Sequence, residues 1–244
     1  MRRLLFTIKY DGTNYHGWQV QPNGITVQEC VQVALQSVTN EKCSVTGCSR
    51  TDSGVHANMF CFHTDTDSSI PTERFTMALN SALPDDIVAI DCKEVSSDFH
   101  ARYDCKGKTY VYKLYDGYLR EPFLNGYAYH HKGALDATLM NNAAKLFVGE
   151  HDFIGFCSVG SSVQDTVRCI SDCSVKRDGR NIEVSITANG FLYNMVRIIV
   201  GTLIEVSDGR ISVDDIPNII DSKKRDMAGQ TAAAHGLYLD KVYY

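Results

Sequence analysis

The chain has 244 residues, of which 44% are hydrophobic and 22% are charged, and its formal net charge is −5. These values are typical of a globular protein with a sizeable apolar core, and they exclude a chain that is disordered throughout. No apolar run approaches the roughly 18 residues needed to cross a bilayer, so we expect no membrane segment and a cytoplasmic location.

The first part of the chain carries the strand and helix patterns of a ferredoxin-like fold. Apolar runs between turn residues predict strands at 4–10, 43–48, 58–64 and 86–95. Apolar residues on one stripe predict two helices, at 26–39 and from Pro71 to Pro84. Thr26 and Glu29 match a capping box at the first helix. The order strand, helix, strand, strand, helix, strand is the ferredoxin-like plan.

The second part repeats some of these features. Its first predicted strand, KTYVYKLYDG (108–117), ends like FTIKYDG (6–12), which suggests a diverged duplication whose halves meet near residue 104. Helices are expected at 136–147 and 191–206, and strands at 167–177, 181–188 and 236–244. The sequence RDGR predicts a hairpin between two of these strands. Because strands and helices mix without strict alternation, the expected class is α+β with a largely antiparallel sheet.

The sequence lacks the common motifs of metal sites and nucleotide cofactors. Nine cysteines are scattered without a Cys-x-x-Cys pair, and no histidine pair has a zinc-site spacing. We therefore expect reduced thiols and no metal. Neither Gly-x-Gly-x-x-Gly nor Gly-x-Ser-x-Gly occurs, and GKT (107–109) lacks the earlier glycine of a phosphate-binding loop. The sequence thus predicts no nucleotide cofactor and no serine hydrolase.

A basic and aromatic segment lies in the middle of the chain. Residues 101–132 hold six basic and three acidic side chains, with seven tyrosines and Phe123 between them. Basic groups that meet phosphates, mixed with rings that stack on bases, are the composition of an RNA-binding face. A tyrosine-rich sheet with a solvated edge would have the same composition, so both interpretations stay open.

The stretch GCSRTDSGVHA (47–57) centres on Asp52. Its Asp-Ser-Gly matches the aspartic-protease signature, but a protease needs two aspartates that share a proton in a dry, uncharged site. Arg50 favours the ionised form of Asp52 and opposes that sharing. The polar residues 48–51 also differ from the apolar strand that should bury such a pair. The protease interpretation is therefore disfavoured.

Two other interpretations of Asp52 remain. It is either a turn or cap residue that uses its side chain on nearby N–H groups, or a catalytic carboxylate. In the second case Asp52 lies on a loop after a strand, is held ionised by Arg50, and is exposed to a ligand by Gly54. A simple turn explains neither Arg50 nor the basic and aromatic segment.

Residues 47–57 resemble the Arg-Thr-Asp-x-Gly-Val-His motif of the TruA-type tRNA pseudouridine synthases. Further blocks similar to that family follow in order along nearly the whole chain: YDGTNYHGWQVQP (10–22), VQE (27–29), ALNSALPDDI (78–87), FHARYDCKGKTYVY (99–112), GEHDF (149–153), NGFLYNMVRIIVG (189–201) and HGLYL (235–239). The sequence departs from the family at Ser49, where glycine is usual, and at Val111, where arginine is common.

The resemblance implies two ferredoxin-like halves that form a continuous, largely antiparallel sheet with helices packed on it. Residues 1–104 would carry the catalytic aspartate loop, and residues 105–244 would complete the active-site cleft. It also implies a homodimer without a small-molecule cofactor. The implied reaction is the isomerisation of uridine to pseudouridine at positions 38, 39 and 40 of the tRNA anticodon stem-loop.

Carried over by position, the resemblance assigns catalysis to Asp52. It assigns four substrate-binding roles: Tyr110 would pack on the target base, Arg50 would help to position the target nucleotide, Arg197 would pair with the aspartate, and Leu237 would line the pocket. The main rival is a tRNA-binding module without catalysis, which would bind tRNA and make no pseudouridine.

One histidine lies close to this motif. His56 follows Asp52 by four residues and could serve as a general base. We expect it to pack within the loop instead, because the implied reaction already has its carboxylate.

Overall fold

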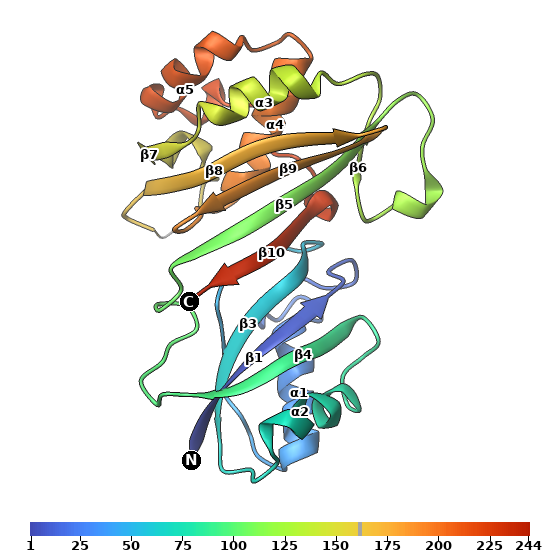
Figure 1. The fold of residues 1–244 in the computed structure, drawn as a ribbon, viewed down its shortest axis with the longest axis vertical. Coiled ribbons are helices and arrows are strands. Elements are labelled where there is room, and N and C mark those ends of the chain that lie inside the picture. The colour runs from blue at the N-terminus through green and yellow to red at the C-terminus, as the bar shows by residue number, and fades with distance from the viewer. Residues whose placement is uncertain (161–162) are drawn as a thin grey trace. The chain divides into compact units, whose positions relative to one another are not determined.

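The computed structural model describes residues 1–160 and 163–244, which divide into two compact units (Figure 1). Unit 1 comprises Met1–Lys106 and Tyr238–Tyr244, and unit 2 comprises Gly107–Leu237. The sequence predicted a single boundary at 104/105 and assigned the last strand to the second half. The structure places residues 238–244 in unit 1 because Tyr238 and Leu239 pair with β3.

The sheet of unit 1 has the order β4-β1-β3-β10, with β2 paired to β3. Its pairs are antiparallel except β3 with β10, which is parallel. The strands are β1 (Arg2–Tyr10), β2 (Val45–Gly47), β3 (His56–Thr66), β4 (Ile87–Val95) and β10 (Leu237–Tyr243). The helices are α1 (Val27–Thr39) and α2 (Thr72–Asn80). All the elements expected in this part of the chain are present, with shifted ends.

Aromatic rings fill the core of unit 1. Phe6 of β1 stacks on Phe62 of β3 at 5.1 Å, and Phe75 of α2 meets Phe6 edge-on at 5.2 Å. Trp18 stacks on Phe60 at 4.0 Å. Because Phe60 and Phe62 are two residues apart on a strand, they lie on one face of the sheet. That face therefore receives both α2 and the loop that carries Trp18.

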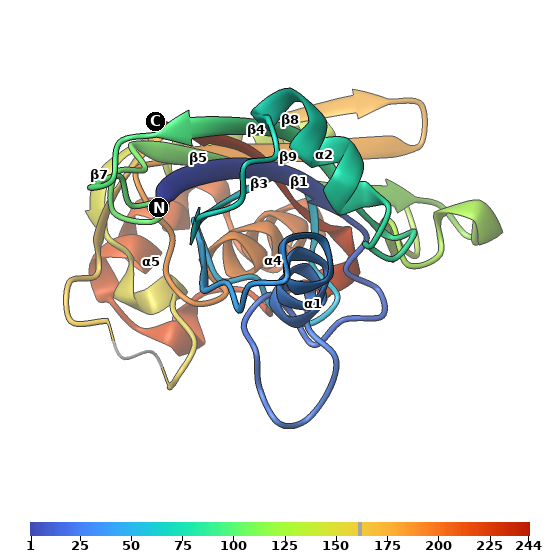
Figure 2. The ribbon, with the colours of Figure 1, turned by 90° about the horizontal axis from the view of Figure 1, so that it is seen from below.

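The sheet of unit 2 has the antiparallel order β5-β9-β8-β7, with β6 paired parallel to β5. Its strands are β5 (Gly107–Asp116), β6 (Tyr129–His131), β7 (Gly149–Asp152), β8 (Val167–Asp178) and β9 (Asn181–Ala188). Its helices are α3 (Ala137–Lys145), α4 (Met195–Ser207) and α5 (Ile216–Ser222), with 3₁₀ turns at Pro122–Leu124, Phe153–Phe156, Val213–Asp215, Arg225–Met227 and Ala234–Gly236. α3 packs on β8, and α4 packs on α3 and β5; Figure 2 shows α4 and α5 below the strands. The predicted α+β class with largely antiparallel pairing is confirmed.

The expected helix at 191–206 begins later than predicted. Asn194 has φ 61°, in the left-handed region that asparagine tolerates, so the helix starts at Met195. The apolar residues of 191–194 had suggested a longer helix. The four positions expected to face inward, Met195, Ile198, Ile199 and Val206, are all buried. The strands β6 and β7 and the helix α5 were not predicted, because three to seven residues carry little periodicity.

Helix α4 lies directly against the chain segment 228–232. The N–H of Gly229 donates to Thr202 Oγ1 at 2.9 Å, and the N–H of Gln230 donates to Glu205 Oε1 at 2.9 Å. A Cβ atom on Gly201 would lie 1.6 Å from the backbone oxygen of Gln230. Only glycine permits this approach of two backbones.

We expect Gly201→Ala to destabilise the protein by about 2 kcal/mol or more, because the helix or segment 228–232 must move to admit the methyl group. The gain in helix propensity, about 1 kcal/mol, is smaller. Urea unfolding measures the effect as a lower midpoint with an unchanged slope. An unchanged midpoint would contradict the close approach.

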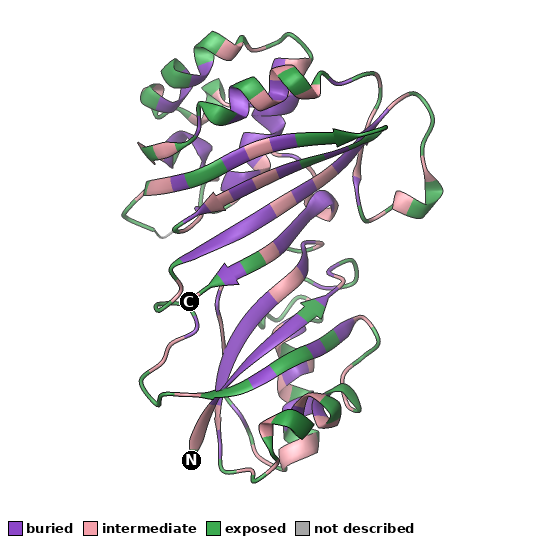
Figure 3. Ribbon diagram, in the orientation of Figure 1, coloured by how far each residue is buried: buried purple, intermediate pink, exposed green. Residues whose placement is uncertain are grey.

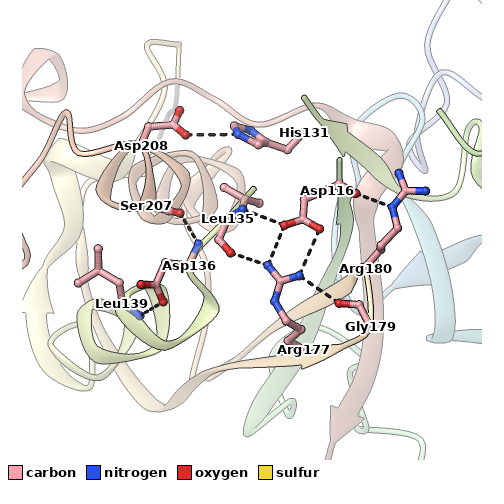
Figure 4. A network of polar contacts seen from close by, with 10 residues as sticks. All are labelled: Asp116, His131, Leu135, Asp136, Leu139, Arg177, Gly179, Arg180, Ser207 and Asp208. Atoms are coloured by element: carbon pink, nitrogen blue, oxygen red, sulfur yellow. Dashed lines mark hydrogen bonds and ion pairs between the residues drawn. The ribbon is translucent and has the colours of Figure 1, made fainter. Parts of the chain in front are cut away.

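A buried polar network holds the end of β5 to the β8–β9 hairpin (Figure 4). Asp116 is 6% exposed and accepts two hydrogen bonds from Arg177, at 3.2 and 2.8 Å, and one from the N–H of Leu135 at 2.8 Å. Arg177 also donates to the carbonyl oxygens of Leu135 and Gly179. These hydrogen bonds lower the pKa of Asp116, chiefly through Arg177, and raise that of Arg177.

The same network anchors residues 117–133. Arg180 donates from Nε to the carbonyl oxygen of Asp116 at 2.7 Å and from Nη2 to that of Leu119 at 2.5 Å. At the other end of the segment, His131 pairs with Asp208 at 3.3 Å. The tip between these anchors is exposed (Figure 3). Its large exposed side chains are Tyr118, Leu119, Phe123 and Tyr127, and Phe123 is 91% exposed.

Candidate active site

The Arg-Thr-Asp motif lies in unit 1, on the loop between β2 and β3. The strand β2 ends at Gly47, where a Cβ would lie 2.7 Å from Trp18, so the loop leaves the sheet over that ring. The backbone N–H of Cys48 donates to the carbonyl oxygen of Cys61 at 2.8 Å and extends the pairing by one residue. Asp52 is half-buried, whereas Arg50 is exposed.

Thr51 is fixed through both its side chain and its backbone. Its Oγ1 lies 2.8 Å from the hydroxyl of Tyr10, and both side chains are buried. Its carbonyl oxygen accepts from the N–H of Trp18 at 3.1 Å. Gly17 permits this second contact: it has φ +80°, and a Cβ there would lie 2.3 Å from the Thr51 oxygen.

The residues after Asp52 form a turn. The carbonyl oxygen of Asp52 accepts from the N–H of Val55 at 3.1 Å, and Gly54 has φ +77°. The carbonyl oxygen of Tyr15 accepts from the N–H of Gly54 at 3.3 Å and from Ser53 Oγ at 3.1 Å. This backbone turn is compatible with either interpretation of the Asp52 side chain.

His56 lies at the start of β3 and is almost fully buried. Its Nδ1 lies 3.1 Å from the N–H of Gly12 and 3.1 Å from Oδ1 of Asp11. Its ring stacks on that of Tyr238 in β10 at 4.6 Å. These contacts agree with the packing role expected for His56, because they join β3 to β10 and to the residues that follow β1.

The residues that clamp this loop were not singled out in the sequence. Tyr10, Tyr15 and Trp18 lie in the block 10–22 that resembles the family, but neither that resemblance nor the local pattern assigned them a role. The glycines Gly12 and Gly17 were the available signal, since each permits close approach to a residue 34–43 positions away: a Cβ on Gly12 would lie 2.0 Å from the oxygen of Val55. A single sequence does not say which backbone approaches a glycine.

The other predicted site residues lie in unit 2. Tyr110 is on β5, opposite Ile186 of β9, and its ring meets that of Phe191 edge-on at 5.0 Å. Leu237 begins β10, and both residues are about 6% exposed. Because both side chains are buried on strands, the surrounding packing holds them in place.

Arg197 lies in the first turn of α4 and is held within unit 2. Its Nε donates to the carbonyl oxygen of Ala232 at 2.7 Å, and its Nη1 donates to Asn194 Oδ1 at 2.7 Å. The hydroxyl of Tyr112 donates to the next carbonyl oxygen, that of Ala233, at 2.8 Å, and burial raises the pKa of Tyr112. Residues 232–233 are thus tied to both α4 and β5, a few residues before Leu237.

The basic and aromatic segment 101–132 separates into two parts. Tyr110, Tyr112 and Tyr115 are buried with Lys108 in β5, as the sheet interpretation expected. The loops before and after β5 carry the exposed members: Arg102, Tyr103, Lys106, Tyr118, Arg120, Phe123, Tyr127 and Lys132. The sheet interpretation therefore describes the members in β5, and the RNA-binding interpretation of the exposed members stays a prediction.

Residues 1–160 and 163–244 contain no cluster of metal ligands and no membrane-spanning helix. In this part of the chain no group of three or more histidine, cysteine, aspartate or glutamate side chains could hold a metal ion. No described helix is long and apolar enough to cross a membrane. None of the nine cysteines, all of which lie within the described residues, forms a disulfide.

The chain belongs to the tRNA pseudouridine synthase family, whose model matches residues 7–104 and 143–244. It is therefore a member of an isomerase family, and the resemblance first seen in the Asp52 motif is confirmed. The tRNA pseudouridine synthase A of Acetivibrio thermocellus is 50% identical over 244 residues, covering all of both chains. Those of Caldicellulosiruptor saccharolyticus and Clostridium acetobutylicum are 49% and 46% identical, again over all of both chains.

A solved structure also resembles the chain. A chain from the crystal structure of a Cbf5-Nop10-Gar1 complex is 13% identical, with a TM-score of 0.34, over 85% of this chain and 54% of that one.

Proposed function

We propose that this chain converts uridine to pseudouridine at positions 38, 39 and 40 of the tRNA anticodon stem-loop, with Asp52 as the catalytic carboxylate. The observation that carries the proposal is the clamped loop around Asp52 in a member of the tRNA pseudouridine synthase family. Thr51 is held from two sides and Gly54 from a third, so the carboxylate is attached to a fixed backbone. Fixed geometry of the reacting group is what catalysis by proximity requires.

The proposed reaction breaks the C1′–N1 bond of uridine, turns the uracil, and forms a C1′–C5 bond. The hydrogen on C5 leaves to solvent and N1 gains a proton, so the step needs no oxidant and no group donor. A base in a stem is out of reach until it is flipped out, at a cost of a few kcal/mol. Asp52 would then act in its ionised form, on the ribose or the base.

The remaining predicted residues have supporting roles in this proposal. Tyr110 would replace the stacking that the flipped base has lost, and Leu237 would line its pocket. Arg50, which is exposed, would contact the target nucleotide. Arg197 would stabilise the charge of Asp52, since an arginine beside a carboxylate favours the ionised form.

We also propose that the protein is a homodimer and that it is cytoplasmic. The exposed apolar side chains at the tip of residues 117–133 support the first point. Burying Leu119 and Phe123 against a second copy would remove their apolar surface from water. The nine cysteines outside any disulfide support the second, since cysteines stay reduced in the cytosol.

The proposed function is tested with anticodon stem-loops that carry one uridine each, at position 38, 39 or 40, and with a control whose only uridine lies elsewhere in the loop. The wild-type protein is expected to form pseudouridine in the first three and not in the control. Binding of all four without product would favour the tRNA-binding module. The aspartic-protease interpretation has no support in a chain of this family.

A further inference from the structure

The hydroxyl pair of Tyr10 and Thr51 is a buried polar contact directly beside Asp52. The two oxygens lie 2.8 Å apart, with Tyr10 4% and Thr51 8% exposed. We propose that Tyr10 is a positioning residue that sets the orientation of Asp52 through the hydroxyl of Thr51. The inference rests on the proposed function, because it requires Asp52 to be the reacting group.

Tyr10 presents its hydroxyl from a rigid element. It is the last residue of β1 and pairs with Ala57 of β3, just after a register shift between Ile8 and Tyr10. Its ring also packs against Phe60 at 5.7 Å. Because Tyr10 is held by strand pairing and by the Phe60 ring, its side chain has little conformational freedom. Its hydroxyl therefore offers the loop a hydrogen-bond partner in a fixed position.

The position of Thr51 makes this contact important. The N–H of Trp18 holds the carbonyl oxygen of Thr51, which belongs to the peptide bond leading into Asp52. The Tyr10 hydroxyl holds Oγ1 of the same residue. Two contacts on different sides of one residue restrict the tilt of that peptide plane more tightly than the backbone contact alone.

A small rotation there would move the reacting carboxylate. A displacement of about 1 Å can cost about 10²-fold in rate, even when binding is unchanged. Removing one hydroxyl also leaves the other buried without this partner, which favours rearrangement of the loop. The loss should therefore appear in the chemical step rather than in tRNA affinity.

The test compares Tyr10→Phe, Thr51→Val and the double variant in single turnovers with enzyme in excess over a uridine-39 stem-loop. Each single variant is expected to lower the rate of pseudouridine formation about 10- to 100-fold, with a dissociation constant within about twofold of wild type. The double variant should be no slower than the slower single variant, because both remove the same contact.

Tyr244→Phe is the matched control, since it removes another tyrosine hydroxyl bond in unit 1, to the carbonyl oxygen of Ala101 at 2.8 Å. It should lower the melting temperature and leave the rate unchanged. If Tyr10→Phe fails to fold, Thr51→Ser carries the test: by restoring the hydroxyl, it should recover most of the rate that Thr51→Val loses.

Three results would overturn the inference. They are a Tyr10→Phe rate equal to wild type at a lowered melting temperature, losses that multiply in the double variant, and a Thr51→Ser rate no better than that of Thr51→Val. Wild-type protein and Asp52→Asn separate this failure from failure of the proposed function. If wild-type protein makes no pseudouridine, the proposed function fails; if Asp52→Asn keeps the wild-type rate, the catalytic role of Asp52 fails; and if Asp52→Asn is inactive while Tyr10→Phe and Thr51→Val keep the wild-type rate, the positioning role alone fails.

Discussion

Replacing Asp52 by asparagine is expected to lower the rate of pseudouridine formation by at least about 10³-fold, with tRNA binding within a few-fold of wild type. Asparagine has almost the same shape, so the clamped loop should survive the change. It cannot attack as an anion or remove a proton, and a positioned acid or base alone contributes about 10²–10⁴-fold.

The measurement is a single-turnover rate at saturating enzyme, with affinity measured separately by filter binding. Asp91→Asn is the matched control, because Asp91 is an exposed aspartate on β4 of the same unit. It should behave as wild type. A rate for Asp52→Asn within tenfold of wild type would remove Asp52 from the chemistry and leave it as a turn residue.

Replacing Arg177 by leucine is expected to destabilise the protein by about 3 kcal/mol, because the change leaves the buried carboxylate of Asp116 without its charged partner. Urea unfolding provides the measurement. Arg210→Leu is the control: Arg210 pairs with Asp208 at 3.0 Å, but its side chain is 63% exposed, and such surface pairs contribute at most about 1 kcal/mol. Equal losses in the two variants would contradict the buried network.

The same pair should make stability depend on pH in acid. Hydrogen bonds from Arg177 hold the folded-state pKa of Asp116 below its ordinary value. A depressed folded pKa contributes stability above the unfolded pKa, about 3.9, and loses it as the pH falls through the lower folded value. The difference in unfolding free energy between wild type and Arg177→Leu, which is the gap to be measured, should therefore narrow below about pH 4. A gap that stays constant to pH 2 would show that the carboxylate is not responsible.

The helices and strands that were predicted are those whose signals lie close together in the sequence. The first helix was found because a capping threonine and an apolar stripe are adjacent in sequence, and the structure shows Thr26 Oγ1 accepting from the N–H of Glu29 at 3.4 Å. The predicted start of α4 at residue 191 was wrong because Asn194 has a left-handed backbone conformation, which excludes the apolar residues before it from the helix. The return of residues 238–244 to unit 1 depends on pairing with residues 56–57, which local periodicity does not encode.

The residues of the candidate site also divide into those with a local signal in the sequence and those that depend on distant contacts. Asp52 was identified because its motif is contiguous, with Arg50 and Gly54 two positions away on either side. The clamp on that motif comes from Tyr10, Tyr15 and Trp18, which are more than thirty residues distant and whose contacts depend on how the loops fold together. The pairing of Arg197 with Asp52 stays a prediction.

The most direct test of the account is tritium release from a uridine-39 anticodon stem-loop labelled at uracil C5. Forming the C1′–C5 bond must expel that hydrogen, whereas binding or base flipping alone leaves it in place. Wild-type protein is expected to release one tritium for each pseudouridine formed, whereas Asp52→Asn is expected to bind the same RNA and release almost none. Tight binding by wild-type protein without release would contradict the account.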